Sequence, residues 1–308
     1  MIFITERLQL RPWRESDAES CFQYAKDPQI GPIAGWPIHT SVEDSRNIIR
    51  NVLAVPETYA VCRKEDSQAI GSIGLLMKEQ SNIEIEEDEC EIGYWLGVPF
   101  WGNGYIPEAV DCMLQYAFTT LQCKKVWCGY FEGNEKSKRV QEKCGFRYHH
   151  TSEQVEWKLM NDIRTEHITC LTKEEYIKGN HIWKQLYRMA RGVQNDRKVS
   201  GYVEAGCVGA AILASSGRIY TGVCVDTCST LGICAERNAI FNMLTNGDDK
   251  IEKVLAVMPD GRTGAPCGAC RELMVQLMPD TYADVEIMVD YETQRIMTLG
   301  ELTPEWWI

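Results

Sequence analysis

Three cysteines and one glutamate in the last third of the chain have the residue types and spacing of a catalytic metal site. Glu236 lies two residues beyond Cys234, and further along the chain Cys267 and Cys270 are separated by two residues. Three thiolates suit a tetrahedral zinc ion, and a hydrolytic zinc site leaves its fourth position to water. Glu236 stands where a proton carrier is needed rather than a fourth ligand. The pattern therefore predicts a hydrolytic zinc centre held by these three cysteines.

Both cysteine segments fall where the pattern predicts the start of a helix. We expect one helix over residues 234–244 and another over residues 267–278. Unpaired N–H groups and the positive end of the helix dipole favour thiolate over thiol at such positions. Arg237 is placed to hydrogen-bond a thiolate and draw off negative charge, and Arg271 is a second candidate for that role.

The elements around these segments are those of an α/β domain. Apolar residues recur at helical spacing over residues 182–193, and two apolar runs flank the turn-forming sequence Ser215-Ser216-Gly217. The runs expected to be strands are residues 208–213, 219–225, 254–258 and 285–289. A succession of strand, strand, helix, strand, helix and strand predicts a mixed sheet with helices on both faces.

This second part, residues 181–308, resembles the cytidine deaminase family, and in particular its blasticidin-S-deaminase-like branch. The residues that carry the resemblance are 208–211, 234–240 and 266–271. An x-Glu step after the first ligand, followed by Pro-Cys-x-x-Cys, is typical of zinc nucleobase deaminases. The resemblance implies a three-layer α/β/α sandwich, zinc on the three cysteines, and Glu236 as proton shuttle during attack of water on C4 of a cytosine-like base.

The sequence departs from that family where the sugar would bind. Relatives usually carry an Asn-x-Glu pair that grips the ribose hydroxyls, and Cys224 and Asp226 stand at those positions. Cysteine is a weak hydrogen-bond partner, so we expect a modified pyrimidine nucleoside, such as a nucleoside antibiotic, rather than ordinary cytidine. A structural zinc knuckle or an inactive relative is the alternative, against which the intact Glu236 argues. Trp306 and Trp307 resemble the family's pocket-covering tail, or they fill a core or a subunit interface.

A glycine-containing loop in the first part of the chain is suited to bind an anion. Residues 101–106, Trp-Gly-Asn-Gly-Tyr-Ile, lie between an expected strand over residues 91–96 and an expected helix over residues 107–121. Glycines let the backbone approach a ligand closely, and amide groups at a helix start point toward phosphate oxygens. A Gly-x-Gly sequence is weak evidence by itself, so its context decides the interpretation.

That context resembles the GNAT acyltransferases of the ribosomal-protein N-acetyltransferase type, over about residues 1–176. The resemblance implies a GNAT-type mixed, mostly antiparallel sheet with helices, and acetyl-CoA as cosubstrate. It is carried, with the loop, by residues 5–12, 91–97, 108–109, 134 and 142–146. It implies that the amides of Gly102, Asn103, Gly104, Tyr105 and Ile106 hold the pyrophosphate and that Asn134 contacts the pantetheine arm.

In that reading an amine attacks the bound thioester directly, and Glu91 is the candidate general base, either directly or through water. A backbone N–H of residues 95–97 would polarise the thioester carbonyl. The alternative is that Glu91 is a strand-edge carboxylate without a chemical role. Gln141 sits where many relatives carry a tyrosine that protonates the leaving thiolate, a role that glutamine cannot fill.

Length and charge bound the remaining possibilities. A chain of 308 residues is long enough for two domains, and the pattern breaks at Lys178-Gly179-Asn180, which predicts domains over residues 1–178 and 181–308. The net charge is −12, divided as −8 and −4 between the two parts. Polynucleotide binding requires basic surface, so we expect small-molecule substrates and no nucleic-acid polymer. No apolar run of membrane-spanning length or secretory signal is present, which favours a cytoplasmic protein.

The expected fold class is therefore α/β with two domains, and the expected function is bifunctional. One half would deaminate a cytosine-like nucleoside or nucleoside antibiotic with zinc, and the other would transfer an acetyl group from acetyl-CoA to a small amine. An active deaminase joined to a CoA-binding sensor or assembly module without turnover is the alternative. The cytidine deaminase resemblance also implies a homo-oligomer, either a tetramer or a dimer, formed through the second domain.

Overall fold

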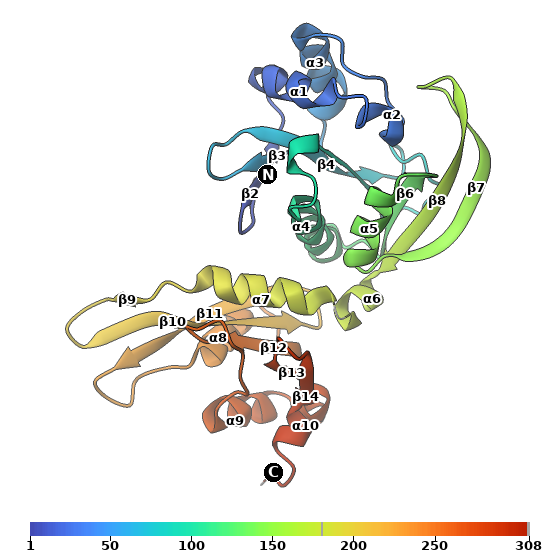
Figure 1. Cartoon of the computed structure of the whole chain (residues 1–308). Coiled ribbons are helices and arrows are strands. Elements are labelled where there is room, and N and C mark those ends of the chain that lie inside the picture. The colour runs from blue at the N-terminus through green and yellow to red at the C-terminus, as the bar shows by residue number, and fades with distance from the viewer. Residues whose placement is uncertain (180, 307–308) are drawn as a thin grey trace. The chain divides into compact units, whose positions relative to one another are not determined.

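The computed structural model describes residues 1–179 and 181–306 (Figure 1). The chain divides into two compact units, Met1–Glu175 and Tyr176–Ile308. The division falls within helix α6 (Lys173–Lys178), close to the break in pattern at Lys178-Gly179-Asn180. Each unit has its own sheet, so the expected α/β class with two sheets is confirmed. No helix in the described part of the chain is long and apolar enough to cross a membrane.

The sheet of unit 1 has the strand order β1-β2-β3-β4-β5-β6-β8-β7. Every neighbouring pair is antiparallel except β5 and β6, which are parallel, as expected for a mixed, mostly antiparallel sheet. The strands are β1 (Phe3–Ile4), β2 (Leu8–Pro12), β3 (Thr58–Arg63), β4 (Ala69–Met77), β5 (Glu89–Leu96), β6 (Lys125–Phe131), β7 (Arg147–Trp157) and β8 (Asp162–Thr172).

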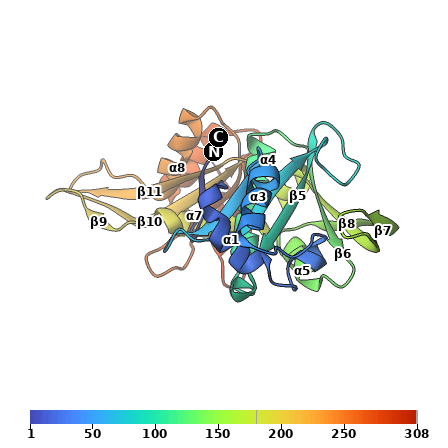
Figure 2. The ribbon, with the colours of Figure 1, turned by 90° about the horizontal axis from the view of Figure 1, so that it is seen from above.

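Helices cover both faces of this sheet. Helices α1 (Ala18–Ala25) and α3 (Val42–Ile48) lie across one face, as Figure 2 shows from above, with the short α2 (Gly31–Ala34) beside them. Helices α4 (Tyr105–Thr119) and α5 (Glu135–Lys143) lie on the other face (Figure 1). The predicted helix over residues 107–121 corresponds to α4.

The parallel pair β5 and β6 separates partway along its length. Only three residue pairs are in register, from Glu89 opposite Lys125 to Glu91 opposite Trp127, whereas β5 stays paired with β4 as far as Leu96. The second halves of β5 and β6 therefore have no backbone partner in each other. The gap that opens between them positions the cavity of unit 1.

The hairpin of β7 and β8 was not predicted from the sequence. Both strands are eleven residues long, and β7 is exposed or partly exposed along its whole length. An edge strand with few buried positions lacks the alternation of apolar and polar residues by which a strand is recognised. The hairpin therefore depends on pairing with β6 rather than on a local hydrophobic pattern.

Unit 2 is a three-layer α/β/α sandwich, as expected. Its sheet has the order β11-β10-β12-β13-β14, with β9 on β10; β12 and β13 are parallel and the other pairs antiparallel. The strands are β9 (Arg197–Lys198), β10 (Val203–Ala214), β11 (Ile219–Thr227), β12 (Ile251–Val257), β13 (Glu286–Asp290) and β14 (Arg295–Thr298). The edge strand β14 and the short helix α10 (Leu299–Leu302) were not predicted.

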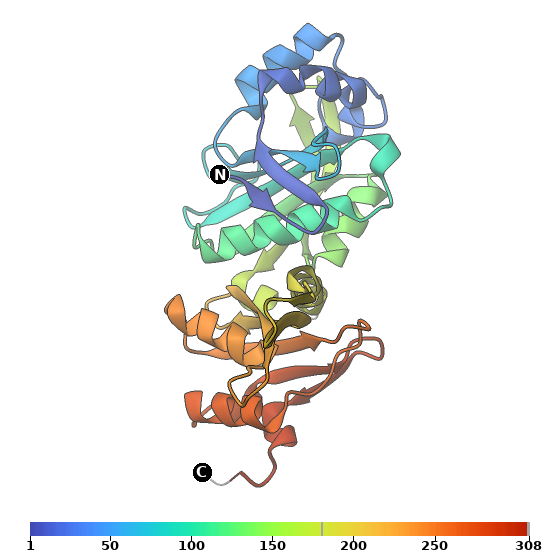
Figure 3. The same cartoon turned by 90° about the vertical axis from the view of Figure 1, so that its left-hand side faces the viewer.

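Helix α7 (His181–Val193) covers one face of this sheet, while α8 (Ala235–Thr245) and α9 (Gly268–Leu277) pack on the other. In Figure 3 the sheet lies between α7, in yellow, and α9, in red. Two glycines allow the close approach: a Cβ at Gly209 would overlap the carbonyl oxygen of Ala190 in α7, and one at Gly222 would overlap the backbone nitrogen of Ala239 in α8. The second contact fixes α8, which carries Glu236, against β11.

Candidate functional site

The structure brings the three predicted zinc ligands together. Cys234 is the N-cap residue of α8, Cys267 is the N-cap residue of α9, and Cys270 lies in the first turn of α9. The Sγ atom of Cys267 lies 3.4 Å from that of Cys234 and 3.5 Å from that of Cys270, and all three sulfurs lie within 4.8 Å of one another. Sulfurs around a tetrahedral zinc ion lie about 3.8 Å apart, since each Zn–S bond is about 2.3 Å. The site fits zinc after small adjustments.

The three cysteines supply three protein ligands to the coordination sphere of a metal ion. Within residues 1–179 and 181–306, no fourth histidine, cysteine or carboxylate belongs to this group. Cys270 is buried, Cys234 is partly buried and Cys267 is exposed, so the group can be reached from solvent on one side. This donor set suits an ion that keeps one position for water.

The helix start shapes the chemistry of the cysteines. Burial raises the pKa of Cys267, but N–H groups of Cys270 and Ala269 and the neighbouring thiols outweigh it, so that the pKa of Cys267 is lowered overall. Burial raises the pKa of Cys270, as does the nearby charge of Glu236, and burial raises the pKa of Cys234. Three thiolates at this spacing repel one another, so a divalent cation is what allows all three to ionise together.

Glu236 lies beside the sulfurs without being one of the group. Its residue is 7% exposed on the first turn of α8, and burial raises the pKa of its carboxyl, which also bonds to Cys270. A carboxyl with a raised pKa gains and loses a proton more readily near neutral pH than an ordinary glutamate does. Its position therefore suits a proton carrier.

Of the two arginines considered for the thiolates, the structure places Arg237 there. Burial lowers the pKa of Arg237, but contacts with Cys234 and Cys270 outweigh this effect and the pKa is raised. Arg271 instead donates to the carbonyl oxygens of Pro266, at 2.8 Å, and Leu302, at 2.9 Å. Arg271 therefore fixes the backbone around the ligand loop, and Arg237 is the residue that can offset thiolate charge.

The positions where the deaminase resemblance expects a ribose clamp carry a thiol pair. Cys224 on β11 is buried, and its Sγ lies 3.2 Å from the Sγ of Cys207 on β10, with a carboxylate oxygen of Asp226 within 4.8 Å of both. Val225, between Cys224 and Asp226, exchanges two backbone hydrogen bonds with Ile233, the residue before Cys234. The altered clamp therefore adjoins the candidate zinc site, and it offers no amide group to a sugar.

Cys207 was not predicted from the sequence to belong to this group. It lies in an irregular stretch of β10, where the register with β11 shifts between Ala205 and Gly209. Such a shift turns a side chain to a face that strict alternation does not predict.

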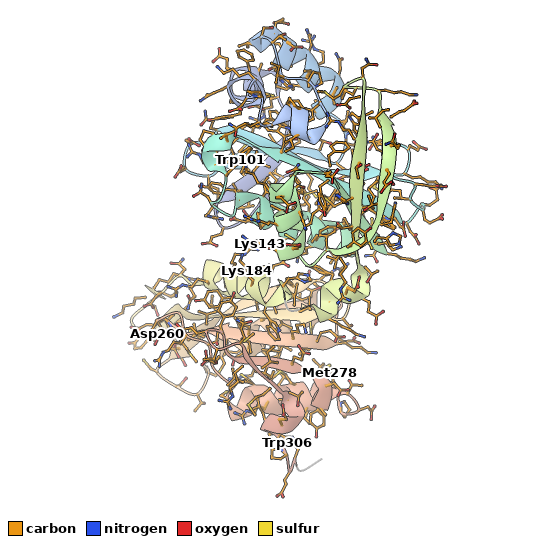
Figure 4. All side chains as sticks on the ribbon, turned by 45° about the vertical axis from the view of Figure 1, so that its right-hand side comes forward. Trp101, Lys143, Lys184, Asp260, Met278 and Trp306 are labelled. Carbon is orange, nitrogen blue, oxygen red and sulfur yellow. The ribbon has the colours of Figure 1, made fainter. Side chains whose placement is uncertain are left out.

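Of the two tryptophans at the chain end, Trp306 lies within the described residues. Trp306 packs, partly buried, against the core of unit 2 next to α9 and α10, and within the described residues its indole N–H has no hydrogen-bond partner (Figure 4). Trp307 lies outside the described residues, so the expected covering role of the aromatic tail rests on Trp306 alone.

In unit 1 the glycine loop opens α4, as predicted. Gly102 has a φ of 80° and Gly104, the N-cap residue of α4, a φ of 77°, a region that side chains strain to adopt. The side chain of Asn103 donates to the carbonyl oxygens of Phe100 and Trp101, which closes the turn and leaves the first amides of α4, those of Tyr105 and Ile106, without helical acceptors.

A cation lies at the edge of this loop. The ammonium of Lys136 is 3.6 Å from the ring centroid of Trp101, whose indole N–H donates to the carbonyl oxygen of Leu96 at 2.8 Å. Lys136 was not singled out from the sequence. Its charge and the free amides together make the loop attractive to an anion.

The gap between β5 and β6 holds a cavity of about 290 Å³. Asn134 lines it, and the side-chain oxygen of Asn134 accepts from the backbone N–H of Ser137 at 3.2 Å, which caps α5. The hydroxyl of Tyr94, which also lines the cavity, lies 3.1 Å from the Ser137 hydroxyl oxygen. Gln141 is buried and bonded to Gly129, Ser137 and Thr169, so its amide serves packing.

Glu91 lines the same cavity. It is 8% exposed, and one of its carboxylate oxygens accepts from the hydroxyl of Ser81 at 2.8 Å and from the backbone N–H of Asn82 at 3.1 Å. Burial raises the pKa of its carboxyl against the lowering effect of these hydrogen bonds. The environment is that of a buried polar site rather than an exposed strand edge.

A second carboxylate, Glu166 on β8, reaches this cavity and was missed from the sequence. It is 9% exposed, and burial, followed by the charge of Glu91, raises its pKa to about 7. Only recognition of the β7–β8 hairpin could have placed it, because its position opposite Phe131 is set by strand pairing.

In comparisons with known proteins, the two parts of the chain match two different families. Residues 7–147 match the family model of the acetyltransferase (GNAT) domain, and residues 183–283 match that of the cytidine and deoxycytidylate deaminase zinc-binding region. A protein of Bacillus licheniformis named uncharacterized N-acetyltransferase p20 is 33% identical over 127 residues, which are 40% of this chain and 68% of that protein.

For the second unit, a cytidine deaminase of Halalkalibacterium halodurans is 35% identical over 101 residues, which are 32% of this chain and 74% of the relative. Among solved structures, an acetyltransferase (GNAT family) from Bacillus anthracis aligns with a TM-score of 0.50 at 22% identity. That alignment covers 57% of this chain and 100% of the other, which shows the fold of unit 1. Zinc and acetyl-CoA, predicted from the sequence, accord with both families.

Proposed function

Because this chain belongs to the GNAT acetyltransferase family through its first unit and to the cytidine deaminase family through its second, we propose that it is a bifunctional enzyme. One activity is hydrolytic, zinc-dependent deamination of a cytosine-like substrate. The other is transfer of an acetyl group from acetyl-CoA to a small amine. The observation that carries the proposal is the group of three sulfurs within 4.8 Å of one another beside the buried carboxyl of Glu236.

In unit 2 the proposed metal ligands are Cys234, Cys267 and Cys270. Zinc bound there supplies a water molecule that ionises near neutral pH. Glu236 takes one proton from that water and delivers it to the ring nitrogen next to the amine-bearing carbon; it then takes the second proton from the oxygen and gives it to the amino group, which departs as ammonia. Arg237 offsets the negative charge of the sulfurs, a role supported by its contacts with Cys234 and Cys270.

The substrate is proposed to be a modified pyrimidine nucleoside, for example a nucleoside antibiotic. The support is the replacement of the usual clamp by Cys224 and Asp226, together with the sulfur of Cys207 beside them. Sulfur is a poor hydrogen-bond partner for a sugar hydroxyl. A substrate that bonds through groups other than ribose hydroxyls loses less at such a site than cytidine does.

In unit 1 the backbone amides of Gly102, Asn103, Gly104, Tyr105 and Ile106 are proposed to bind the pyrophosphate of acetyl-CoA. Asn134 contacts the pantetheine arm, for which its side-chain N–H₂ remains available because capping uses only the oxygen. Glu91 is the proposed general base, directly or through water. Its burial and its place on the cavity between β5 and β6 support the assignment.

Substitution of Gly104 by valine is expected to weaken acetyl-CoA binding by at least tenfold. Gly104 has a φ of 77°, where a β-branched residue is strained by about 1–3 kcal/mol, and a side chain would also occupy space next to the amides. Calorimetric titration with acetyl-CoA measures the change. Gly145→Val is the matched control because Gly145, at the end of α5, has a φ of 87° but lies outside the loop. Equal weakening in both variants would show that strain alone is responsible.

The proposal is tested by measuring ammonia release from cytidine, deoxycytidine and aminoacyl-nucleoside antibiotics, and thiol release from acetyl-CoA with a panel of amines. Bifunctionality predicts turnover in both assays. Gln141 supports one alternative for unit 1, since it stands where a proton donor is expected and is locked by packing. Binding of acetyl-CoA without thiol release would identify unit 1 as a sensor or assembly module.

We also propose that the protein is a homo-oligomer and that it is cytoplasmic. The deaminase resemblance supports a homotetramer or dimer through unit 2, and light scattering of the purified protein measures the state directly. Each of the fourteen cysteines is a free thiol, which accords with a reducing, cytoplasmic environment.

A further inference from the structure

Two buried carboxylates share the cavity of unit 1, and they differ in their partners. Glu91 is anchored by the Ser81 hydroxyl and the Asn82 N–H. Glu166, more than nine-tenths buried, forms no hydrogen bond or ion pair with any described residue although it lines the same cavity. A carboxylate that lines a cavity without a protein partner is available to a ligand bound there.

The backbone opposite Glu166 makes room for it. Gly129 on β6 has no side chain, and a Cβ at this position would overlap the carboxylate oxygen of Glu166. Glu166 therefore occupies the space that a side chain of β6 would otherwise fill. This places its carboxylate against β6, in the cavity that Glu91 also lines.

The walls of the cavity favour a cation. Among the described residues that line it, none is lysine, arginine or histidine. Aromatic rings attract cations through their faces and also cover apolar groups. The aromatic residues in the lining are Trp36, Tyr94, Trp95, Tyr130, Phe131 and Trp157.

We propose that Glu166 is a catalytic residue that takes a proton from the acceptor amine, and that the acceptor is a small amine bound as an ammonium ion with an apolar or aromatic body. Glu91, the proposed general base, supplies the second negative wall of this site and takes the second proton from nitrogen as the nitrogen–carbon bond forms. The inference rests on the proposed acetyl transfer, and it identifies the class of acceptor that unit 1 takes.

The ammonium R–NH₃⁺ gives one proton to the carboxylate of Glu166 and becomes a neutral amine. Its lone pair attacks the thioester carbonyl carbon, a nitrogen–carbon bond forms, and the carbon–sulfur bond breaks. The sulfur leaves as thiolate and receives the second proton lost by nitrogen, so that the products are the amide and CoA thiol. Glu166 then returns its proton to solvent.

The groups around Glu166 set the pH at which it can act. Burial and the charge of Glu91 raise the pKa of Glu166 to about 7, so it can both accept and release a proton near neutral pH. From β7 the residue opposite Glu166 is the neutral Ser152. The other titratable side chains of the cavity lining are Glu91, Tyr94, Cys128 and Tyr130. On β8, Arg164 and His167 lie within two residues of Glu166.

Glu166→Gln is expected to lower kcat/KM for a cationic acceptor by about 10²–10⁴-fold, the range for loss of a general base. It should also remove the rise of kcat/KM with pH near 7 and leave acetyl-CoA binding within twofold of the wild type. Glu153→Gln, an exposed glutamate on β7, is the control and should change none of these values. An unchanged kcat/KM and pH profile in Glu166→Gln would overturn the role of Glu166.

A stability measurement checks that the substitution acts at a buried carboxyl. Because the pKa of Glu166 is raised from 4.5 to about 7 in the folded chain, its stabilising contribution is present below the unfolded value and lost as pH rises through about 7. The melting temperature of Glu166→Gln should therefore fall less than that of the wild type between pH 6 and pH 8. Equal falls would show that Glu166 is not held in such an environment.

Binding without acetyl transfer separates this inference from the proposed function. Calorimetry compares phenethylamine hydrochloride with sodium phenylacetate, which have similar aromatic bodies and opposite charges. The wild-type protein should bind the ammonium at least tenfold more tightly than the carboxylate, and Glu166→Gln should reduce that preference. If the wild-type protein prefers the ammonium but releases no thiol, the proposed acetyl transfer is refuted and the cationic site stands. Equal binding of the two compounds, or preference for phenylacetate, refutes the cationic site.

Discussion

Glu236→Gln is expected to slow ammonia release by about 10²–10⁴-fold while the protein keeps its zinc. Glutamine has nearly the same size as glutamate but can neither accept the proton of water nor deliver it to the ring, and general acid–base catalysis contributes rate factors of this order. Glu236 is buried beside the sulfurs and is not one of the group that can hold the ion. The loss should therefore appear in kcat, measured as ammonia released per second, with metal content unchanged.

Glu292→Gln is the matched control, since Glu292 is exposed in the turn between β13 and β14. It should retain both turnover and zinc. Ammonia release by Glu236→Gln within threefold of the wild type would remove Glu236 from the mechanism. Loss of zinc in that variant would instead assign Glu236 to the coordination of the ion.

Cys267→Ser should lose most of its zinc and all measurable deamination. Of these three cysteines, Cys267 is the one whose pKa is lowered, because amides at the start of α9 bond to its sulfur. A serine hydroxyl does not ionise at neutral pH. A ligand that binds only the folded state stabilises it by about 4 kcal/mol at a thousandfold excess over its Kd. The thermal transition of unit 2 should therefore move to lower temperature, measured together with zinc by elemental analysis.

Cys228→Ser tests whether any thiol would give the same result. Cys228 is exposed and belongs to neither cluster of possible ligands. It should keep zinc, turnover and thermal stability. Full zinc occupancy and activity in Cys267→Ser would mean that the metal is held elsewhere.

The candidate zinc site could be predicted from the sequence because its parts are local. Cys234 and Cys267 are N-cap residues at the starts of two helices that were expected at these positions from the sequence. Cys270 follows Cys267 within one turn, so its sulfur reaches the same ion in any helix that starts there. The one non-local requirement is that the starts of α8 and α9 lie close together. The ligand pattern already implied this, because one ion has to bind cysteines from both helices.

The acceptor cavity of unit 1 could be predicted only in part. Glu91 follows from a strand and a family resemblance, whereas Glu166 reaches the site only because β8 pairs with β6 in the register that sets Glu166 opposite Phe131. Strand register over such a distance in sequence is fixed by tertiary packing and leaves no periodic signal in an exposed hairpin. The pairing of Cys207 with Cys224 was missed for the related reason that β10 is irregular there.

X-ray absorption of the zinc-loaded protein tests the central claim most directly, namely that the three cysteines hold a catalytic ion with one position left to water. The expected first shell has three sulfurs at about 2.3 Å and one oxygen at about 2.0 Å. A shell of four sulfurs, or of three sulfurs and a histidine nitrogen, would contradict the account because no position would remain for the water that attacks the base.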